Sequence, residues 1–170
     1  MVDVCPDRST FAPKCRSLFV MTTVGEHPGV GLADSANLTI KYGLLDTSVL
    51  VAEENAWPLM AERFPEFLYV SPITLAELEA RILSAPDEET REVRQRTLDL
   101  VSGMTVLEIN EQVASCWSSL LVQLASAGRR VDSNHLWTAA IAYAYGVGLI
   151  TTDTDLHALD DLDGPIIIDV

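Results

Sequence analysis

The sequence predicts an α/β domain in which a mostly parallel β-sheet lies between layers of helices. Short apolar runs alternate along the chain with longer segments of helical periodicity, and this alternation is typical of parallel α/β sheets. Polar residues follow the apolar runs directly, as expected where buried parallel strands end. The length of 170 residues and the hydrophobic share of 48% are sufficient for one buried core.

The domain is expected to occupy residues 38–170, behind an N-terminal extension at residues 1–37. The extension mixes Pro and Gly with scattered polar residues and shows no sustained hydrophobic period. Such a composition favours irregular structure.

Five strands are expected in the domain. The apolar runs that predict them lie at residues 38–45, 67–70, 105–109, 147–152 and 165–170. Each run has the length of a strand and is bounded by polar or turn residues. The first run ends at Asp46 and the fourth at Asp153, so both acids are expected at the carboxyl end of a strand.

Helices are expected between these strands. They are predicted at residues 47–60, with a break or a second start at Pro58, and at 72–82, 84–102, 110–128, 133–145 and 155–159. Ser71 followed by Pro72 is typical of a helix start, and Asn110 precedes a stripe of apolar residues at helical spacing. The segment 133–145 is apolar nearly all round, which indicates a buried helix.

Composition and charge exclude several classes of protein. No apolar run approaches the roughly 18–20 residues of a membrane span, and the longest early run, at residues 18–21, is too short for a signal peptide. We therefore expect a soluble, cytoplasmic protein. The 11 basic and 25 acidic residues give a formal net charge of −14, whereas a passive nucleic-acid binder is usually basic. Contact with nucleic acid would need bound cations or a local basic patch.

Four acidic residues point to a metal site. Asp46 and Asp153 end the first and fourth strands, and ligand sites in open parallel sheets lie beyond such ends. Glu77 comes one turn into the helix after the second strand, and Asp155 follows Asp153 by two residues. Converging carboxylates repel one another unless a cation neutralises them, and oxygen ligands favour Mg²⁺ or Mn²⁺. Such an ion polarises phosphodiesters and activates water, so we predict metal-dependent phosphodiester hydrolysis.

Three of these acids also have a purely structural interpretation. On its own, Asp46 before Thr and Ser is typical of a helix cap, Glu77 of a solvated helix residue, and Asp153 of a turn. The functional hypothesis depends on the three acids occurring together in one fold.

Four segments resemble the successive motifs of PIN-domain ribonucleases, and most closely those of the VapC toxins of type II toxin–antitoxin pairs. They are residues 42–52 (YGLLDTSVLVA), 72–81 (PITLAELEAR), 129–142 (RRVDSNHLWTAAIA) and 148–156 (GLITTDTDL). The resemblance implies a three-layer α/β/α fold with a five-stranded sheet in the order 3-2-1-4-5. It also implies Mg²⁺- or Mn²⁺-dependent endoribonuclease activity, homodimerisation, and inhibition by a cognate VapB antitoxin.

The resemblance further implies roles for single residues. Asp46 would be the first metal carboxylate, supported by the Ser48 hydroxyl. Glu77 would be the second acid, Asp153 the fourth, and Asp155 an accessory ligand.

The third acid of the family pattern is replaced in this chain. The family commonly has Asn-Asp before the buried helix, whereas this chain has Asn134, a supporting residue, followed by His135. A neutral imidazole binds Mn²⁺ tolerably and suits Mg²⁺ poorly. His135 is therefore either a metal ligand or a partly buried polar residue with no metal. We expect a PIN ribonuclease with an altered metal preference, or a weakened one.

Two other functional classes are compatible with parts of the pattern. One is an inactive PIN-like domain that mainly binds an antitoxin. The other is an aspartyl-phosphate phosphatase or receiver domain, which also has Asp at the end of the first strand. Haloacid dehalogenase-type phosphatases have a second Asp where this chain has Ser48, and receiver domains need a late Lys, whereas no Lys follows Lys41.

Four arginines, on or near two consecutive helices, are candidates for an RNA groove: Arg81, Arg91, Arg94 and Arg96. Ion pairs with neighbouring glutamates are the simpler interpretation. The candidate partners are Glu79, Glu88, Glu89 and Glu92.

Overall fold

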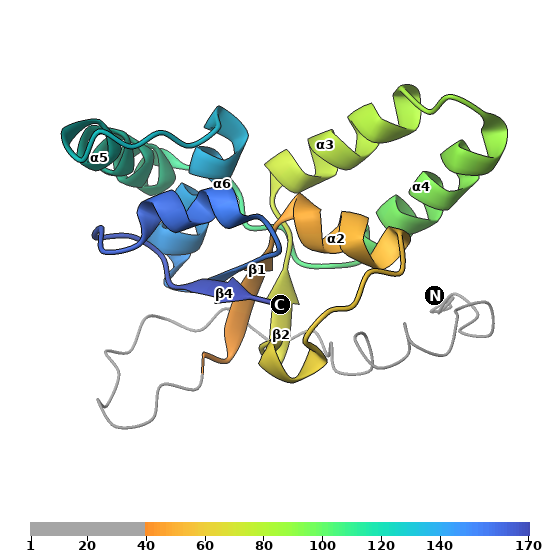
Figure 1. Cartoon of the computed structure of the whole chain (residues 1–170), viewed down its shortest axis with the longest axis horizontal. Coiled ribbons are helices and arrows are strands. Elements are labelled where there is room, and N and C mark those ends of the chain that lie inside the picture. The colour runs from red at the N-terminus through yellow and green to blue at the C-terminus, as the bar shows by residue number, and fades with distance from the viewer. Residues whose placement is uncertain (1–39) are drawn as a thin grey trace, which may run out of the picture.

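A parallel sheet with helices on both faces forms the fold in the computed structural model, which describes residues 40–170 (Figure 1). The strands are β1 (Tyr42–Leu45), β2 (Phe67–Tyr69), β3 (Gly148–Thr151) and β4 (Ile167–Asp169). They pair only in parallel, in the order β2-β1-β3-β4. The α/β prediction is thus confirmed, while the predicted N-terminal extension, residues 1–37, lies outside the described residues.

The prediction of five strands in the order 3-2-1-4-5 is wrong in its third strand. Residues 105–109 contribute only a single parallel bridge, between Val106 and Val70. Two backbone hydrogen bonds, of 3.2 and 2.9 Å, connect Val70 to this segment. The pairing ends there because Asn110 already caps the next helix. The four strands that form keep the neighbours expected for them.

Five α-helices connect the strands in the described part of the chain. They are α2 (Thr47–Glu54), α3 (Pro72–Leu83), α4 (Glu88–Val101), α5 (Glu111–Ser126) and α6 (Ser133–Tyr145), with short 3₁₀ helices η2 (Ala61–Arg63) and η3 (Thr154–Leu159). A polar side chain accepts a backbone N–H at the start of every α-helix, which satisfies one of the free donors there. These caps are Asp46, Ser71, Asp87, Asn110 and Asp132.

Helix α2 is shorter than the predicted helix at 47–60. It ends at Glu54, and Ala56 adopts a positive φ of 53°, a conformation that cannot continue a right-handed helix. The Trp57 N–H then donates to the Ala52 carbonyl at 2.9 Å, which closes the helix end.

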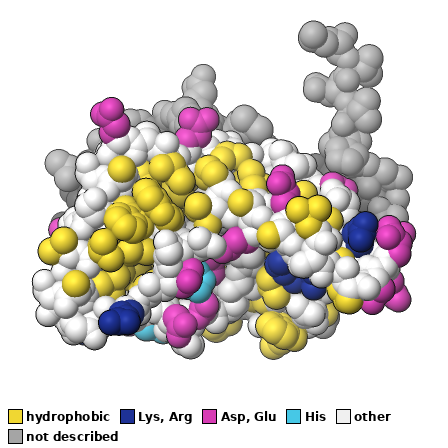
Figure 2. All heavy atoms as spheres, turned by 90° about the horizontal axis from the view of Figure 1, so that it is seen from above, with side chains coloured by type: hydrophobic (Ala, Val, Ile, Leu, Met, Phe, Trp, Pro, Cys, Tyr) yellow, Lys and Arg dark blue, Asp and Glu magenta, His cyan; other side chains and the backbone are white. Residues whose placement is uncertain are grey.

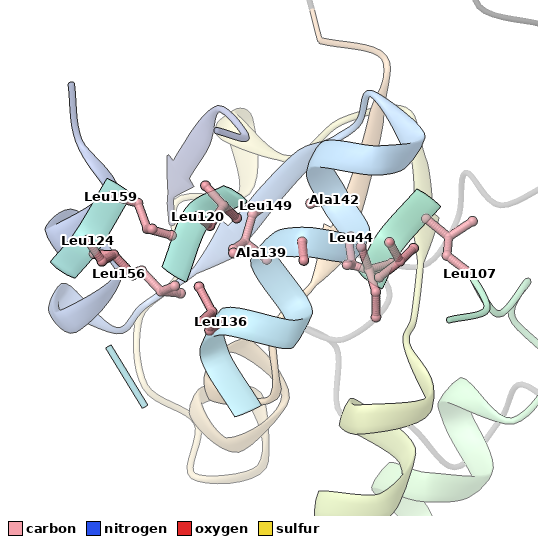
Figure 3. Close-up of a cluster of buried hydrophobic side chains, with 13 residues drawn as sticks. Leu44, Leu107, Leu120, Leu124, Leu136, Ala139, Ala142, Leu149, Leu156 and Leu159 are labelled. Atoms are coloured by element: carbon pink, nitrogen blue, oxygen red, sulfur yellow. The ribbon is translucent and has the colours of Figure 1, made fainter. Parts of the chain in front are cut away.

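Two hydrophobic cores lie on the opposite faces of the sheet. Side chains of a strand alternate between its faces; accordingly, Leu44 and Leu149 pack with α5 and α6, whereas Leu45 and Ile150 pack with α2, α3 and α4. Figure 3 shows the first core, where α5 and α6 leucines and alanines surround the strand residues. The sheet is therefore the middle of three layers, as predicted.

None of the helices at residues 40–170 combines the length and the apolar character needed to cross a membrane.

Candidate functional site

The carboxyl ends of β1 and β3 bring two of the predicted acids together. The two strands are adjacent and parallel, with Leu45 opposite Ile150. Asp46 follows β1 directly and Asp153 follows β3 after one residue. After β1 the chain enters α2 on one face of the sheet, and after β3 it enters η3, whose Leu156 and Leu159 pack in the core on the other face. Such a change of face at neighbouring strand ends opens a crevice in which open α/β sheets bind ligands.

Asp46 is a buried carboxylate held by hydroxyl groups. The residue is 1% exposed. Its Oδ2 accepts hydrogen bonds from the Ser48 hydroxyl at 2.5 Å and the Thr151 hydroxyl at 3.1 Å, and from the Ser48 N–H at 3.3 Å. Asp46 therefore does cap α2, but two hydroxyls from separate elements also orient it. No Lys or Arg within residues 40–170 forms an ion pair with it.

Glu77 is fixed between three helices. Its Oε1 accepts a hydrogen bond of 2.7 Å from the Asn134 side-chain amide at the start of α6. Its Oε2 accepts one from the Thr47 hydroxyl at the start of α2. Because both oxygens have protein donors, the interpretation of Glu77 as a merely solvated helix residue is wrong.

Asp153 lies beside His135, the residue that departs from the family pattern. Its Oδ2 lies 3.5 Å from the His135 Nε2, and its Oδ1 accepts the Asp155 N–H at 2.9 Å, which is the turn chemistry expected of it. Asp155 itself is exposed. The His135 Nδ1 is buried and has no hydrogen-bond partner within the described residues.

These contacts join the site residues into a closed series around the crevice. From Asp46, contacts lead to Thr151, Asp153 and His135. The next residue in the chain from His135 is Asn134, and contacts lead on to Glu77 and Thr47, the sequence neighbour of Asp46. Figure 2 shows acidic side chains and a histidine exposed together near the middle of the face seen from above, between an apolar area and basic side chains. The predicted residues thus occupy one end of the sheet.

The carboxylates surround the crevice without converging on one point. Within residues 40–170, no three His, Cys, Asp or Glu side chains lie close enough together to hold one metal ion between them. The assignment of metal ligands to Asp46, Glu77, Asp153, Asp155 and His135 therefore stays a prediction.

The donor set nevertheless fits a hydrated hard cation. Mg²⁺ commonly uses only one or two carboxylates and keeps several waters, which bridge to further groups. Carboxylates and hydroxyls supply such oxygens here, without Lys or Arg partners among the described residues. The imidazole of His135 adds a nitrogen that Mn²⁺ accepts more readily than Mg²⁺.

Two hydroxyl residues of the site were missed by the sequence interpretation. Thr151 ends β3 and donates to Asp46, and its own oxygen accepts the Asp153 N–H at 2.9 Å. Thr47 donates to Glu77. Each stands within two residues of a predicted acid, in the sequences DTS and TTD. That proximity was the available signal, although it does not reveal which acid each hydroxyl contacts.

Two of the four arginines pair with a residue that was not predicted: Arg81 and Arg94 lie beside Glu54 at the end of α2, at 3.0 and 3.9 Å. Within residues 40–170, Arg91 pairs with a predicted partner, Glu88, at 3.8 Å, and Arg96 forms no ion pair. Glu54 precedes Arg81 by 27 residues, so the contact could not be predicted from residue spacing within one helix.

Comparison with known proteins places this geometry in a family. Residues 43–162 match the PIN domain. The chain belongs to the PIN-domain family. It is 39% identical over 118 residues to ribonuclease VapC5 of Mycobacterium tuberculosis, which covers 69% of this chain and 87% of that protein. It is 34% identical over 127 residues to ribonuclease VapC4 of the same organism, which covers 74% of this chain and 97% of that protein.

A solved structure supports the same placement within the PIN-domain family. The crystal structure of VapBC-5 from Mycobacterium tuberculosis, a member of the VapBC family of toxin–antitoxin systems, contains a chain with a TM-score of 0.72 to this one. The two chains are 37% identical, and the match covers 76% of this chain and 99% of that chain. This chain is therefore a VapC-like PIN domain, as the sequence motifs indicated.

Proposed function

We propose that the protein is a metal-dependent endoribonuclease that acts as the toxin of a type II toxin–antitoxin pair. One observation carries the proposal: Asp46, Glu77 and Asp153 come from three separate elements and line the same end of the sheet. The 39% identity to ribonuclease VapC5 supports RNA as the substrate.

The residues of the crevice would hold the cation and set its surroundings. Asp46, Glu77 and Asp153 would bind Mg²⁺ or Mn²⁺, with Asp155 and His135 as further ligands. When bound, the cation lowers the pKa of an attacking water and neutralises charge on the phosphodiester. The Ser48 and Thr151 hydroxyls hold the Asp46 carboxylate in one orientation.

The side chains that donate hydrogen bonds to the acids mainly fix the orientation of their carboxylates. Asn134 and Thr47 leave the Glu77 carboxylate little freedom to rotate, so less conformational entropy is lost when a ligand binds. Because Asp46 and Glu77 have no Lys or Arg counter-charge among residues 40–170, the crevice repels a phosphodiester until a cation is present. The protein's own residues thereby make catalysis depend on the metal.

A second candidate function follows from His135. Its imidazole stands beside Asp153 where the family pattern has an acid, which removes one negative charge from the crevice. A PIN-like domain that has lost most of its activity and mainly binds an antitoxin is the alternative that this substitution favours.

The proposed partners are a cognate VapB-like antitoxin and RNA. The VapBC-5 structure supports the antitoxin, and the formal net charge of −14 suits a partner with a basic segment. Homodimerisation stays a prediction from the resemblance.

An RNA cleavage assay distinguishes the two functions. The protein, freed of any partner, is incubated with structured RNA and either Mg²⁺ or Mn²⁺, beside an Asp46→Ala variant. We expect cleavage by the parent that EDTA abolishes and that the variant lacks. Equal traces of cleavage in both proteins would identify a contaminant. If the parent does not cleave RNA, the antitoxin-binding function is supported instead.

A further inference from the structure

Helices α2 and α3 are connected by polar contacts at both ends of α2. At its first residue, the Thr47 hydroxyl donates to Glu77. At its last residue, the Glu54 carboxylate accepts two hydrogen bonds of 3.0 Å each from the Arg81 guanidinium. Glu77 and Arg81 are four residues apart in α3, so they lie one turn apart on the same helix face. The site contact and the ion pair therefore belong to one helix–helix interface.

The ion pair is partly buried and well defined. The Glu54 side chain is 7% exposed and the Arg81 side chain 24%. Two parallel N–H···O bonds between a guanidinium and a carboxylate restrict the angle as well as the distance between the groups. A lysine ammonium in place of Arg81 would keep the charge and lose this restriction.

Helix α4 completes the arrangement around Arg81. The Arg94 guanidinium donates to the Arg81 backbone carbonyl, and its Nε lies 3.9 Å from Glu54. The Thr97 hydroxyl donates to Glu54 at 3.4 Å. Arg81 is thus held by its side chain against α2 and by its backbone against α4, whereas the first turn of α3 is held separately by the Thr74 hydroxyl on the Leu45 carbonyl at 3.1 Å.

An apolar contact of similar size would stabilise this junction at least as well. Burying an ion pair costs desolvation that the attraction between the charges does little more than offset. Beyond stability, the ion pair provides a fixed geometry between α2 and α3. This geometry bears on Glu77 of α3, whose Oε1 lies 2.7 Å from the Asn134 amide.

We propose that Arg81 is a positioning residue of the site: by its paired hydrogen bonds to Glu54 it sets α3 so that the Glu77 carboxylate faces Thr47 and Asn134. The inference rests on the proposed metal-dependent ribonuclease function for its catalytic consequence. Arg81 touches neither the cation nor the RNA in this role.

The test compares Arg81→Lys with Arg91→Lys in the full chain. Both variants keep the charge, and Arg91 is a suitable control because its side chain is 51% exposed and its ion pair within residues 40–170 is with Glu88 on its own helix. We expect Arg81→Lys to lower kcat and to weaken Mn²⁺ binding, each by about tenfold, as changes to residues that orient ligands commonly do. The KM for RNA and both properties of Arg91→Lys should stay within about twofold of the parent.

Each alternative role for Arg81 gives a different result. Equal kcat and Mn²⁺ affinity in Arg81→Lys and Arg91→Lys would overturn the proposal. A rise in KM with unchanged kcat would also overturn it, because that outcome assigns Arg81 to RNA binding. If Arg81→Lys melts well below Arg91→Lys, Glu54→Gln tests the same contact from α2, and a parental kcat and Mn²⁺ affinity in that variant would overturn the proposal.

Failure of the proposed function is recognised separately, in the parent. If the parent neither cleaves RNA nor binds Mn²⁺, the ribonuclease proposal fails, and the position of Glu77 is then measured in a crystal structure of Arg81→Lys. Loss of the Glu77–Asn134 contact supports the positioning role, and its retention overturns that role.

Discussion

The two faces of the sheet are stabilised by different means. The face covered by α5 and α6 has an almost entirely apolar core, in which Leu120, Ile141 and Leu149 are fully buried. The face covered by α2, α3 and α4 has a second apolar core and, beside it, the partly buried ion pair of Glu54 and Arg81. Both faces contribute site residues, since Asn134 and His135 lie in the first turn of α6 and Glu77 lies within α3. Apolar packing holds α6, whereas an ion pair of fixed geometry also holds α3.

Removing apolar volume from the α5–α6 face should have the largest effect on stability. Leu120 is fully buried, and Leu120→Ala leaves a cavity, so we expect a loss of about 3 kcal/mol in the free energy of unfolding. The neighbouring Leu121 is 43% exposed, and Leu121→Ala should change that free energy by less than about 0.5 kcal/mol. Urea denaturation of both variants measures the difference. Similar losses in the two would show that α5 is not packed as described.

Much of the fold was predictable because its signals are local. The bounds of α6 at Ser133–Tyr145 agree with the apolar segment, and α3 starts where Ser71 and Pro72 indicated. A cap, a turn residue or an apolar period acts over a few residues, so the sequence displays it directly. The four strands that form also occur where short apolar runs lie.

One error occurs where distant contacts decide the structure. Residues 105–109 have the composition of a strand, but only Val106 pairs, and its partner is Val70, just beyond the end of β2. The end of α2 is an error of a different kind, because its cause is local: Pro58 indicated a break, but the helix already ends at Glu54, two residues before Ala56 adopts a positive φ.

The candidate site was predictable in its residues and less so in its contacts. Strand ends identified Asp46 and Asp153, because parallel strands place their carboxyl ends at one edge. The partners of Glu77, in α2 and α6, lie 30 and 57 residues away, and the pairing of Arg81 with Glu54 spans 27. Contacts of such separation depend on how the helices pack, which no short motif contains.

His135, like Asn134, is a site residue that comes from the α5–α6 face, so changing it sharpens the comparison. His135→Asp restores a carboxylate beside Asp153, and we expect Mg²⁺-dependent cleavage to rise by about tenfold, since oxygen ligands suit Mg²⁺ better than imidazole does. Cleavage rates with Mg²⁺ and with Mn²⁺ measure the change, and the ratio of the two rates should move toward Mg²⁺. A folded variant that is no more active than the parent with Mg²⁺ would contradict this interpretation of residue 135.

The smallest effect is expected at the outer end of the polar face, where Asp87 caps α4. The Thr90 N–H donates to the Asp87 Oδ1 at 2.7 Å, and this backbone hydrogen bond, with that of the Thr90 side chain, lowers the pKa of the Asp87 carboxyl below its ordinary value. A carboxyl whose pKa is lower in the folded state stabilises the fold above its unfolded pKa, about 4, and loses this contribution as the pH falls through the folded pKa. Asp87→Asn keeps a capping oxygen but cannot ionise.

Thermal unfolding as a function of pH measures this contribution. The Tm of the parent should exceed that of Asp87→Asn at pH 7, and the difference should disappear as the pH falls below about 4. Asn110→Asp, at the start of α5, is the opposite substitution, because it introduces an ionisable cap on the apolar face. The Tm of this variant should exceed that of the parent only at the higher pH. If the difference between the parent and Asp87→Asn is constant with pH, the charge of Asp87 does not contribute to the cap. In that case the thermal stability of the polar face would not depend on the ionisation of its outermost cap. The contribution of charge to this face would then lie at the junction of Glu54 with Arg81.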